Sequence, residues 1–258
     1  TRQGDKITNE SPVAQDSLLI DLSRQTEKVI DLGPTISNQS YATQIATIEG
    51  KEKFLLLDET HIYIFDWMQG NLQDSIPTAA CGTLMDYSGF TYISQDSIFV
   101  FNDLQGILYL INRKGEIEST WRIPHGTSPE DLTPSINALN RTRIRLCNGK
   151  AVLSGTTQGN LAQAKGIKIP VSEILNLETK EWKNVVFYPD LYTRHSWGSS
   201  YLNTVHTAQD GKGCHLYSFP ILDYVLRYSP DFSSCDTLPM KSRHDRGISA
   251  CKLSNEDY

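Results

Sequence analysis

Two short segments carry the residues best suited to bind a charged ligand. Residues 194–198 read RHSWG, residues 243–247 read RHDRG, and a third segment begins at His125. An arginine guanidinium presents a fork of donors that fits a carboxylate or a phosphate, and aromatic rings commonly line ligand sites. These residues form the predicted ligand-binding set: Arg194, His195, Trp197, His125, Arg243, His244 and Arg246. The alternative for each residue is an ordinary polar role in a surface loop.

Other arrangements that could support catalysis or bind a metal are weak in this sequence. His195, His206 and His215 do not have a standard metal-ligand spacing. The two serines after Gly198 lack the G-x-S-x-G pattern of a nucleophile elbow. The segment 128–131 (SPED) is typical of the start of a short helix. The sequence therefore predicts no catalytic residue, no metal site and no cofactor.

Composition and charge narrow the classes of partner. The 258-residue chain has a net charge of −6 and 39% hydrophobic residues. An excess of negative charge disfavours binding to a nucleic-acid backbone, so we expect no nucleic-acid partner. No apolar run reaches the roughly 18 residues that a membrane-spanning helix needs. One short run, residues 141–145 (RTRIR), is locally basic, and we interpret it as the solvated edge of a strand.

The beginning of the chain suggests processing. Its first residue is Thr1, and the polar residues 1–15 resemble the flexible tether that follows a removed export signal. We therefore expect a tether over residues 1–15 and a folded domain over residues 16–258.

The cysteines have no metal-binding pattern. The five are odd in number and include no C-x-x-C pair. We expect the cysteines to be unpaired and buried. The alternative is that Cys214 and Cys235 fall on neighbouring strands and form a disulfide.

A hairpin unit recurs along the chain and predicts the architecture. The unit is an apolar strand, a polar turn and a second strand that often ends in proline, and it occurs at residues 62–77, 108–124, 174–189 and 225–239, with a fainter copy at 18–30. A polar residue that can bond turn amides ends each first strand: Ser23, Asp66, Asn112, Glu178 and Ser229. Gly70 and Gly115 supply the positive φ that such turns need.

Two further strand patterns precede most of the hairpins. Residues 53–58, 97–102, 151–156 and 213–219 form one set, and residues 43–48 and 200–208 belong to the other. Four antiparallel strands per repeat are typical of the blades of a β-propeller, so we predict an all-β propeller. The alternative is a β-sandwich with similar hairpins.

The repeats also predict a blade count. Residues 18–30 supply only the outer half of a blade, and residues 247–253 resemble an inner strand. Five blades are readable, and we expect the chain to be a fragment of a six- or seven-bladed ring; the alternative is an imperfectly closed ring of five.

With these hairpins and the segments 192–198 (YTRHSWG) and 216–220 (LYSFP), the chain resembles an uncharacterised family of exported β-propeller lipoproteins of Bacteroidetes-type bacteria. The resemblance implies a signal peptide, a lipid anchor just upstream of Thr1 and a location in the cell envelope. It carries over no catalytic residues.

The loops that leave the outermost strands gather on one face of a propeller, around the mouth of the central channel. Here such loops begin after Leu32, Pro77, Pro124, Pro189 and Pro239, and they include the predicted ligand-binding set. We expect a non-catalytic binding module whose ligand is a small molecule, glycan or protein, with an anion or a carbohydrate at the channel mouth. The alternative is a lyase or glycoside hydrolase that uses His195 or His244 as acid or base.

Overall fold

The computed structural model describes residues 30–32, 36, 42–81, 87–123, 135–156, 161, 167–194, 197 and 200–240. All the elements below belong to the unit that spans Asp31–Tyr258. Because residues 1–29 lie outside the described part, the predicted tether and its boundary stay predictions.

Four antiparallel sheets form the described part of the fold, and we call them blades 1 to 4. Blade 1 contains β1 (Ala42–Ile48), β2 (Lys51–Leu57), β3 (His61–Asp66) and β4 (Leu72–Pro77). Blade 2 contains β5 (Tyr87–Ser94), β6 (Ser97–Asn102), β7 (Ile107–Ile111) and β8 (Ile117–Arg122). Blade 3 contains β10 (Arg145–Cys147), β11 (Lys150–Thr156), β12 (Pro170–Asn176) and β13 (Trp182–Phe187), with the short β9 (Ser135–Ile136) also paired to β11. Blade 4 contains β14 (His206–Gln209), β15 (His215–Ser218), β16 (Tyr224–Tyr228) and β17 (Cys235–Pro239).

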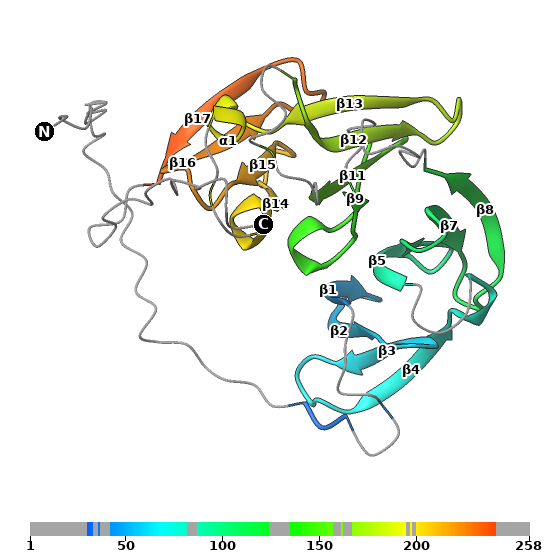
Figure 1. The fold of residues 1–258 in the computed structure, drawn as a ribbon. Helices are drawn as coiled ribbons and strands as arrows, with labels where there is room; N and C mark the ends of the chain where they lie inside the picture. The colour runs from blue at the N-terminus through cyan, green and yellow to red at the C-terminus, as the bar shows by residue number, and fades with distance from the viewer. Residues whose placement is uncertain are drawn as a thin grey trace, which may run out of the picture. The chain divides into compact units, whose positions relative to one another are not determined.

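Short helical segments connect the strands. They are the 3-10 helices η2 (Ala79–Cys81), η3 (Asn140–Thr142) and η5 (Ser200–Asn203), and the α-helix α1 (Asp190–Arg194). The first strand of each blade lies toward a common centre and the last at the periphery (Figure 1). This radial arrangement confirms the predicted β-propeller and rules out the β-sandwich. The fainter hairpin at 18–30, the strand at 247–253 and the helix start at 128–131 lie outside the described residues, so a fifth blade stays a prediction.

Local turn chemistry explains the hairpins. Asp66 Oδ1 accepts hydrogen bonds from the amides of Met68 and Gln69, both at 2.9 Å, and Gly70 then takes a φ of 74°. Asn112 does the same in blade 2, where its Oδ1 accepts from the Lys114 amide at 2.9 Å. Both turns confirm the prediction, because a short polar side chain can replace a backbone acceptor in a tight turn.

The turn of blade 3 differs from the prediction. The sequence favoured Glu178 as the residue that ends the first strand. Asn176 has that role instead, because its Oδ1 accepts from the amides of Glu178 at 3.0 Å and Thr179 at 3.1 Å. The positive φ falls on Lys180, at 61°, rather than on a glycine. A strict search for glycine therefore misses this turn.

The predicted strand at 200–208 is correct only in its second half. Residues 200–203 form η5, and β14 begins at His206. Two buried tyrosines hold the 3-10 turn: Tyr188 donates its hydroxyl hydrogen to the Asn203 carbonyl at 2.6 Å, and Tyr192 donates to the Leu202 carbonyl at 2.7 Å. These carbonyls are therefore taken up by tertiary contacts and do not join a sheet.

Apolar side chains fill the space between successive blades. Both faces of β6 are buried: Ile98 and Val100 belong to the cluster with blade 1, whereas Phe99 and Phe101 belong to the cluster with blade 3. A third cluster joins blades 3 and 4 and contains Val171, Val186, Tyr188, Tyr192, Tyr217 and Phe219. Because full burial of one such side chain stabilises a fold by roughly 1.5–3 kcal/mol, these interfaces supply the main stabilisation of the blades.

The described cysteines are free. Cys214 precedes β15 and Cys235 lies on β17, with β16 between these strands, so the alternative that the two fall on neighbouring strands and form a disulfide is wrong. Cys81 is fully buried, whereas Cys235 is exposed. Burial raises the pKa of the Cys81 thiol to about 12, which keeps it protonated and unreactive.

A close backbone approach fixes the distance between blades 2 and 3 at Gly89. A Cβ atom at this position on β5 would lie 1.8 Å from the Ala138 carbonyl oxygen. The obstacle is backbone and cannot rotate away. Only glycine therefore fits where β5 passes the segment before η3.

We expect Gly89→Ala to lower the free energy of unfolding by at least about 1–3 kcal/mol, the usual cost of overpacking. Denaturant unfolding followed by circular dichroism measures this effect. Gly211→Ala is the matched control, since a Cβ there meets nothing within 4 Å. Equal unfolding midpoints for the two variants would contradict the close approach.

The buried carboxyl of Glu173 should make the stability of the fold depend on pH. Glu173 is 5% exposed and pairs across the sheet with Leu153, which packs against blade 2, and burial raises the pKa of its carboxyl to about 7. An unfolded Glu ionises near about pH 4.3, so the folded state keeps its proton between about pH 4.5 and 7 while the unfolded state loses it. The stability present at low pH is therefore lost as the pH rises through that range.

We expect the free energy of unfolding of the wild type to fall over this range by on the order of 2–3 kcal/mol more than that of Glu173→Gln. Denaturant titrations at a series of pH values measure the difference. The exposed Glu178, changed to Gln, serves as the control and keeps the wild-type slope. An identical slope in Glu173→Gln would show that the carboxyl ionises freely in the fold.

Candidate functional site

Residues 140–145, which we call the axial segment, consist of η3, residues 143–144 and the first residue of β10. They contact the inner strands of three other blades. Asn140 Oδ1 accepts from the Thr43 amide of β1 at 2.8 Å, and its Nδ2 donates to Thr43 Oγ1 at 3.0 Å. Thr91 of β5 donates its hydroxyl hydrogen to the Ile144 carbonyl at 2.8 Å. Thr207 of β14 donates to the Arg141 carbonyl at 3.2 Å. The axial segment thus links blades 1, 2 and 4 at their inner ends.

Two arginines of this segment each donate a hydrogen bond to a different blade. Arg143 Nη2 donates to the Thr43 carbonyl at 2.6 Å, and Arg145 Nη2 donates to Thr207 Oγ1 at 2.8 Å. Both residues are partly buried, and this burial lowers the pKa of each guanidinium. β10 is indeed the first strand of its sheet. The interpretation of a solvated edge is nevertheless wrong for Arg143 and Arg145, because the neighbouring blades cover them.

No carboxylate compensates these two charges in the described part of the chain. The ion pairs there join Lys53 to Asp66, Arg113 to Asp74, Arg194 to Asp190, and Arg227 to Asp210. The positive charge of Arg143 also lowers the pKa of Arg145, so the two guanidinia repel each other. A buried charge without a partner is unfavourable, which makes this pair unusual.

Buried polar side chains lie beside Arg145. Tyr217 and His215 of β15 are both fully buried, and His215 Nδ1 has no hydrogen-bond partner among the described residues. Burial raises the pKa of Tyr217, whereas hydrogen bonding to the side chains of Ser172 and Ser154 lowers it. The positive charge of Arg145 also acts against the shift in the pKa of Tyr217 that burial causes. Burial also lowers the pKa of His215, and Arg145 adds to that effect. The charge of the Arg145 guanidinium therefore influences the pKa of both side chains.

The described part of the chain offers no histidine hydrogen-bonded to a carboxylate. His215 Nε2 lies 3.4 Å from the Pro230 carbonyl, and its ring stacks on Phe232 with 4.3 Å between the ring centroids. The carboxylate that influences His215 is Asp210, but Arg227 binds it through Nε at 3.0 Å and Nη2 at 2.8 Å. This geometry does not provide a general base oriented by a carboxylate.

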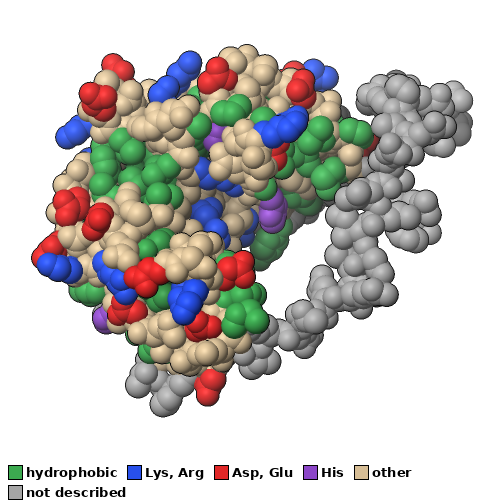
Figure 2. Space-filling model, turned by 180° about the vertical axis from the view of Figure 1, so that it is seen from behind, with side chains coloured by type: hydrophobic (Ala, Val, Ile, Leu, Met, Phe, Trp, Pro, Cys, Tyr) green, Lys and Arg blue, Asp and Glu red, His purple; other side chains and the backbone are tan. Residues whose placement is uncertain are grey.

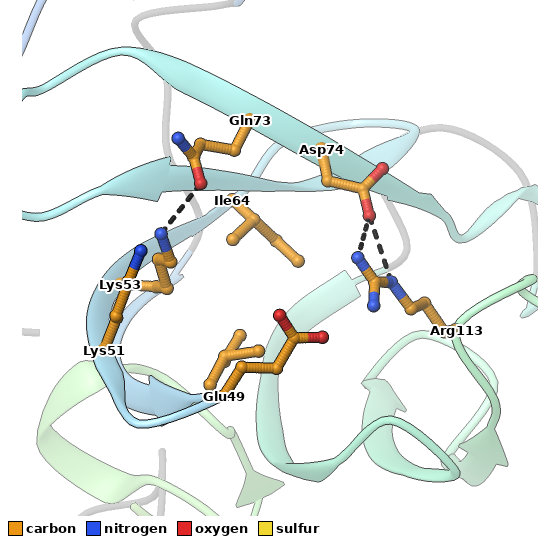
Figure 3. A pocket seen from close by; sticks show the side chains of 8 residues that line it. Glu49, Lys51, Lys53, Ile64, Gln73, Asp74 and Arg113 are labelled. Carbon is orange, nitrogen blue, oxygen red and sulfur yellow. Dashed lines mark hydrogen bonds and ion pairs between the residues drawn. The ribbon is translucent and has the colours of Figure 1, made fainter.

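A pocket of about 220 Å³ lies between blades 1 and 2 (Figure 3). It is lined by Ile48, Glu49, Lys51, Lys53, Ile64, Gln73, Asp74 and Arg113. Two of its cations already have acceptors: Lys53 Nζ donates to Asp66 at 2.9 Å and Gln73 at 2.8 Å, and Arg113 Nε donates to Asp74 at 3.0 Å. The Lys53 bond, together with backbone amides, lowers the pKa of Asp66 to about 2. These internal pairs make the pocket a weaker candidate than the axial arginines.

The structure describes two residues of the predicted ligand-binding set. Arg194 ends α1, where its Nη2 lies 3.3 Å from Asp190 Oδ2 and its side chain is 69% exposed. Trp197 is buried: its indole N–H donates to the Leu191 carbonyl at 3.4 Å, and its ring packs on Tyr192. The remaining members, which are His195, His125, Arg243, His244 and Arg246, lie outside the described residues, so the set as a whole stays a prediction.

The alternating RTRIR run in the sequence drew attention to the arginines of the axial segment, but it did not show that two of them are partly buried. Alternation places Arg141, Arg143 and Arg145 on one side of an extended chain. Whether that side of the chain faces solvent depends on contacts with Thr43 and Thr207, which belong to other blades.

The described residues show neither a metal-binding cluster nor a membrane span. No group of three His, Cys, Asp or Glu side chains is placed to hold a metal ion in these ranges. In the same ranges, no helix has both the length and the apolar character needed to cross a membrane.

Comparison with known proteins finds similar folds but no family. No protein-family model and no curated protein matches the sequence. A solved member of the DUF4221 family from Bacteroides vulgatus matches with a TM-score of 0.65 and 17% identity, covering 82% of this chain and 61% of that chain. A candidate exported protein from Bacteroides fragilis matches with a TM-score of 0.50 and 12% identity, covering 81% of this chain and 52% of that chain. The chain thus shares a propeller fold with Bacteroides proteins and spans only about half to three-fifths of their length.

Proposed function

We propose that the protein is a non-catalytic binding module of the bacterial cell envelope that takes its ligand at the inner ends of the blades. The observation that carries this proposal is the pair Arg143 and Arg145, which are partly buried and have no carboxylate partner in the described part of the chain. Donors without acceptors at the centre of a propeller are suited to an anion or a carbohydrate.

The placement in the envelope is supported by the sequence and by the structural neighbours. The polar residues 1–15 and the resemblance to exported lipoproteins both favour export, with a lipid anchor upstream of Thr1. One structural neighbour is itself a candidate exported protein of Bacteroides. We therefore propose a periplasmic or surface location.

Binding without chemistry agrees with the groups present. A propeller lyase or hydrolase would need a convergent acid and base. Among the described residues, His215 is buried without a carboxylate bond, and Glu173 pairs with Leu153 on the face of blade 3 toward blade 2. We propose that the exit-loop residues Arg194 and His195 contribute a second surface to the site.

A ligand screen tests the proposal. We expect at least one compound from a panel of neutral sugars and small anions to raise the melting temperature of the protein and to remain chemically unchanged after incubation. Hydrogen–deuterium exchange with that compound bound should show protection of the axial segment and of β14, because the ligand would cover these backbone groups.

Turnover of the compound, or protection confined to other blades, would contradict the proposal. Arg194→Ala separates the two surfaces of the site. The Arg194→Ala variant should bind the compound more weakly if the exit loops contribute to the site. In either case, the bound compound should still protect the axial segment.

A further inference from the structure

We infer that Arg143 and Arg145 bind a compact oxyanion with two negative charges, such as a phosphoryl group or a dicarboxylate. The inference rests on the proposed function, since it names the class of ligand that the inner ends of the blades would take. It follows from the donors, the charge, the fixed position of the two guanidinia and the charge of the remaining surface.

Each guanidinium has donors that no described residue accepts. Within the described ranges, Arg143 and Arg145 each donate through Nη2 only, to the Thr43 carbonyl and to Thr207 Oγ1. Nε and Nη1 of both residues donate to no acceptor in the described structure. An arginine that uses one nitrogen for positioning keeps the others for a ligand, and its planar geometry matches two oxygens of one oxyanion.

The charges explain why the ligand should carry two negative charges. Burial lowers the pKa of both guanidinia, and Arg143 lowers that of Arg145 further, so the pair is held together against repulsion. A monoanion would compensate one of the two positive charges, whereas a dianion compensates both. A neutral sugar would leave the repulsion as it is.

The contacts of the axial segment fix the two side chains before any ligand arrives. Thr43 receives the Arg143 bond and is itself bonded to Asn140, while Thr207 accepts from Arg145 and donates to the Arg141 carbonyl. Groups held in this way lose little conformational entropy when a ligand binds, which favours affinity. His215 Nδ1, which has no hydrogen-bond partner among the described residues and is influenced by the charge of Arg145, shows that further polar capacity is unused there.

The surroundings favour a small anion over a long polyanion. Lys and Arg side chains lie in the recessed centre of the molecule, whereas acidic side chains are spread over the blades around it (Figure 2). With a net charge of −6, the protein repels an extended polyanion along most of its surface. A small dianion meets that repulsion only on the way to a positive centre.

Calorimetric titration tests the inference with inorganic phosphate at pH 8, succinate, sulfate and the neutral succinamide as probes. We expect the wild type to bind at least one of the three dianions, more weakly as salt increases, and not to bind succinamide. Arg143→Gln and Arg145→Gln should each weaken binding at least tenfold, and Arg145→Lys should bind less tightly than the wild type because it loses the fork. The affinity order of phosphate and succinate distinguishes a phosphoryl ligand from a dicarboxylate.

Arg122→Gln is the matched control, because it removes one positive charge from an exposed position on β8 and should keep wild-type affinity. The glutamine variants should unfold at or above the wild-type temperature without ligand, since each removes a repulsive charge, and this measurement shows that they are folded. Should either variant fail to fold, exchange protection of the axial segment by the dianion in the wild type decides the question.

Absence of binding by all three dianions, or equal binding by wild type and Arg145→Gln, would overturn the inference. A neutral sugar that protects the axial segment in a protein that ignores dianions would overturn it too, yet leave the proposed function standing. Failure of every probe to protect the axial segment would refute both.

Discussion

The structure depends on one constraint: the apolar faces of the sheets must be covered, and successive blades cover each other, blades 2 and 3 on both faces. β6 shows it most clearly, because its alternate side chains enter two different clusters. A single hairpin or sheet of this composition would leave half of its apolar surface in water. Stacking around a centre covers the surfaces that successive blades turn toward each other, in three apolar clusters between blades 1 and 2, 2 and 3, and 3 and 4, and it brings the first strands of the blades together. The polar contacts of the axial segment are possible only because the apolar faces have already set that geometry.

Local features of the fold could be predicted from the sequence, since their causes lie within a few residues. Asp66 and Gly70 specify their turn through bonds to the next amides and a positive φ. Asn176 has the same role in blade 3, and it was overlooked in favour of Glu178 because Lys180 rather than glycine takes the left-handed conformation. The 3-10 helix η5 was predicted as a strand. Its carbonyls are held by the hydroxyls of tyrosines outside the segment, and a local strand pattern contains no sign of those contacts.

The candidate site was harder to predict, because it depends on which blade lies opposite. The sequence directed attention to exit loops, where Arg194 is exposed and paired with Asp190 and Trp197 is buried in the core. The arginines of the axial segment were visible as a run but were assigned to solvent. Their partners are 100 residues away for Arg143 and 62 for Arg145. No rule based on spacing along one strand can supply that information.

The axial segment also has a consequence for how the molecule is assembled. Its bonds to Thr43 close loops of about a hundred residues. Closing loops of this length has a high entropic cost, so these contacts should form late in folding. Blades 1 and 2 can build their hairpins and their shared core without it. The two guanidinia acquire their positions only when blades 1, 3 and 4 have met. The charged centre thus exists only when blades 1, 3 and 4 are assembled, and a chain cut between its first and third blades would lose it while keeping most of its strands.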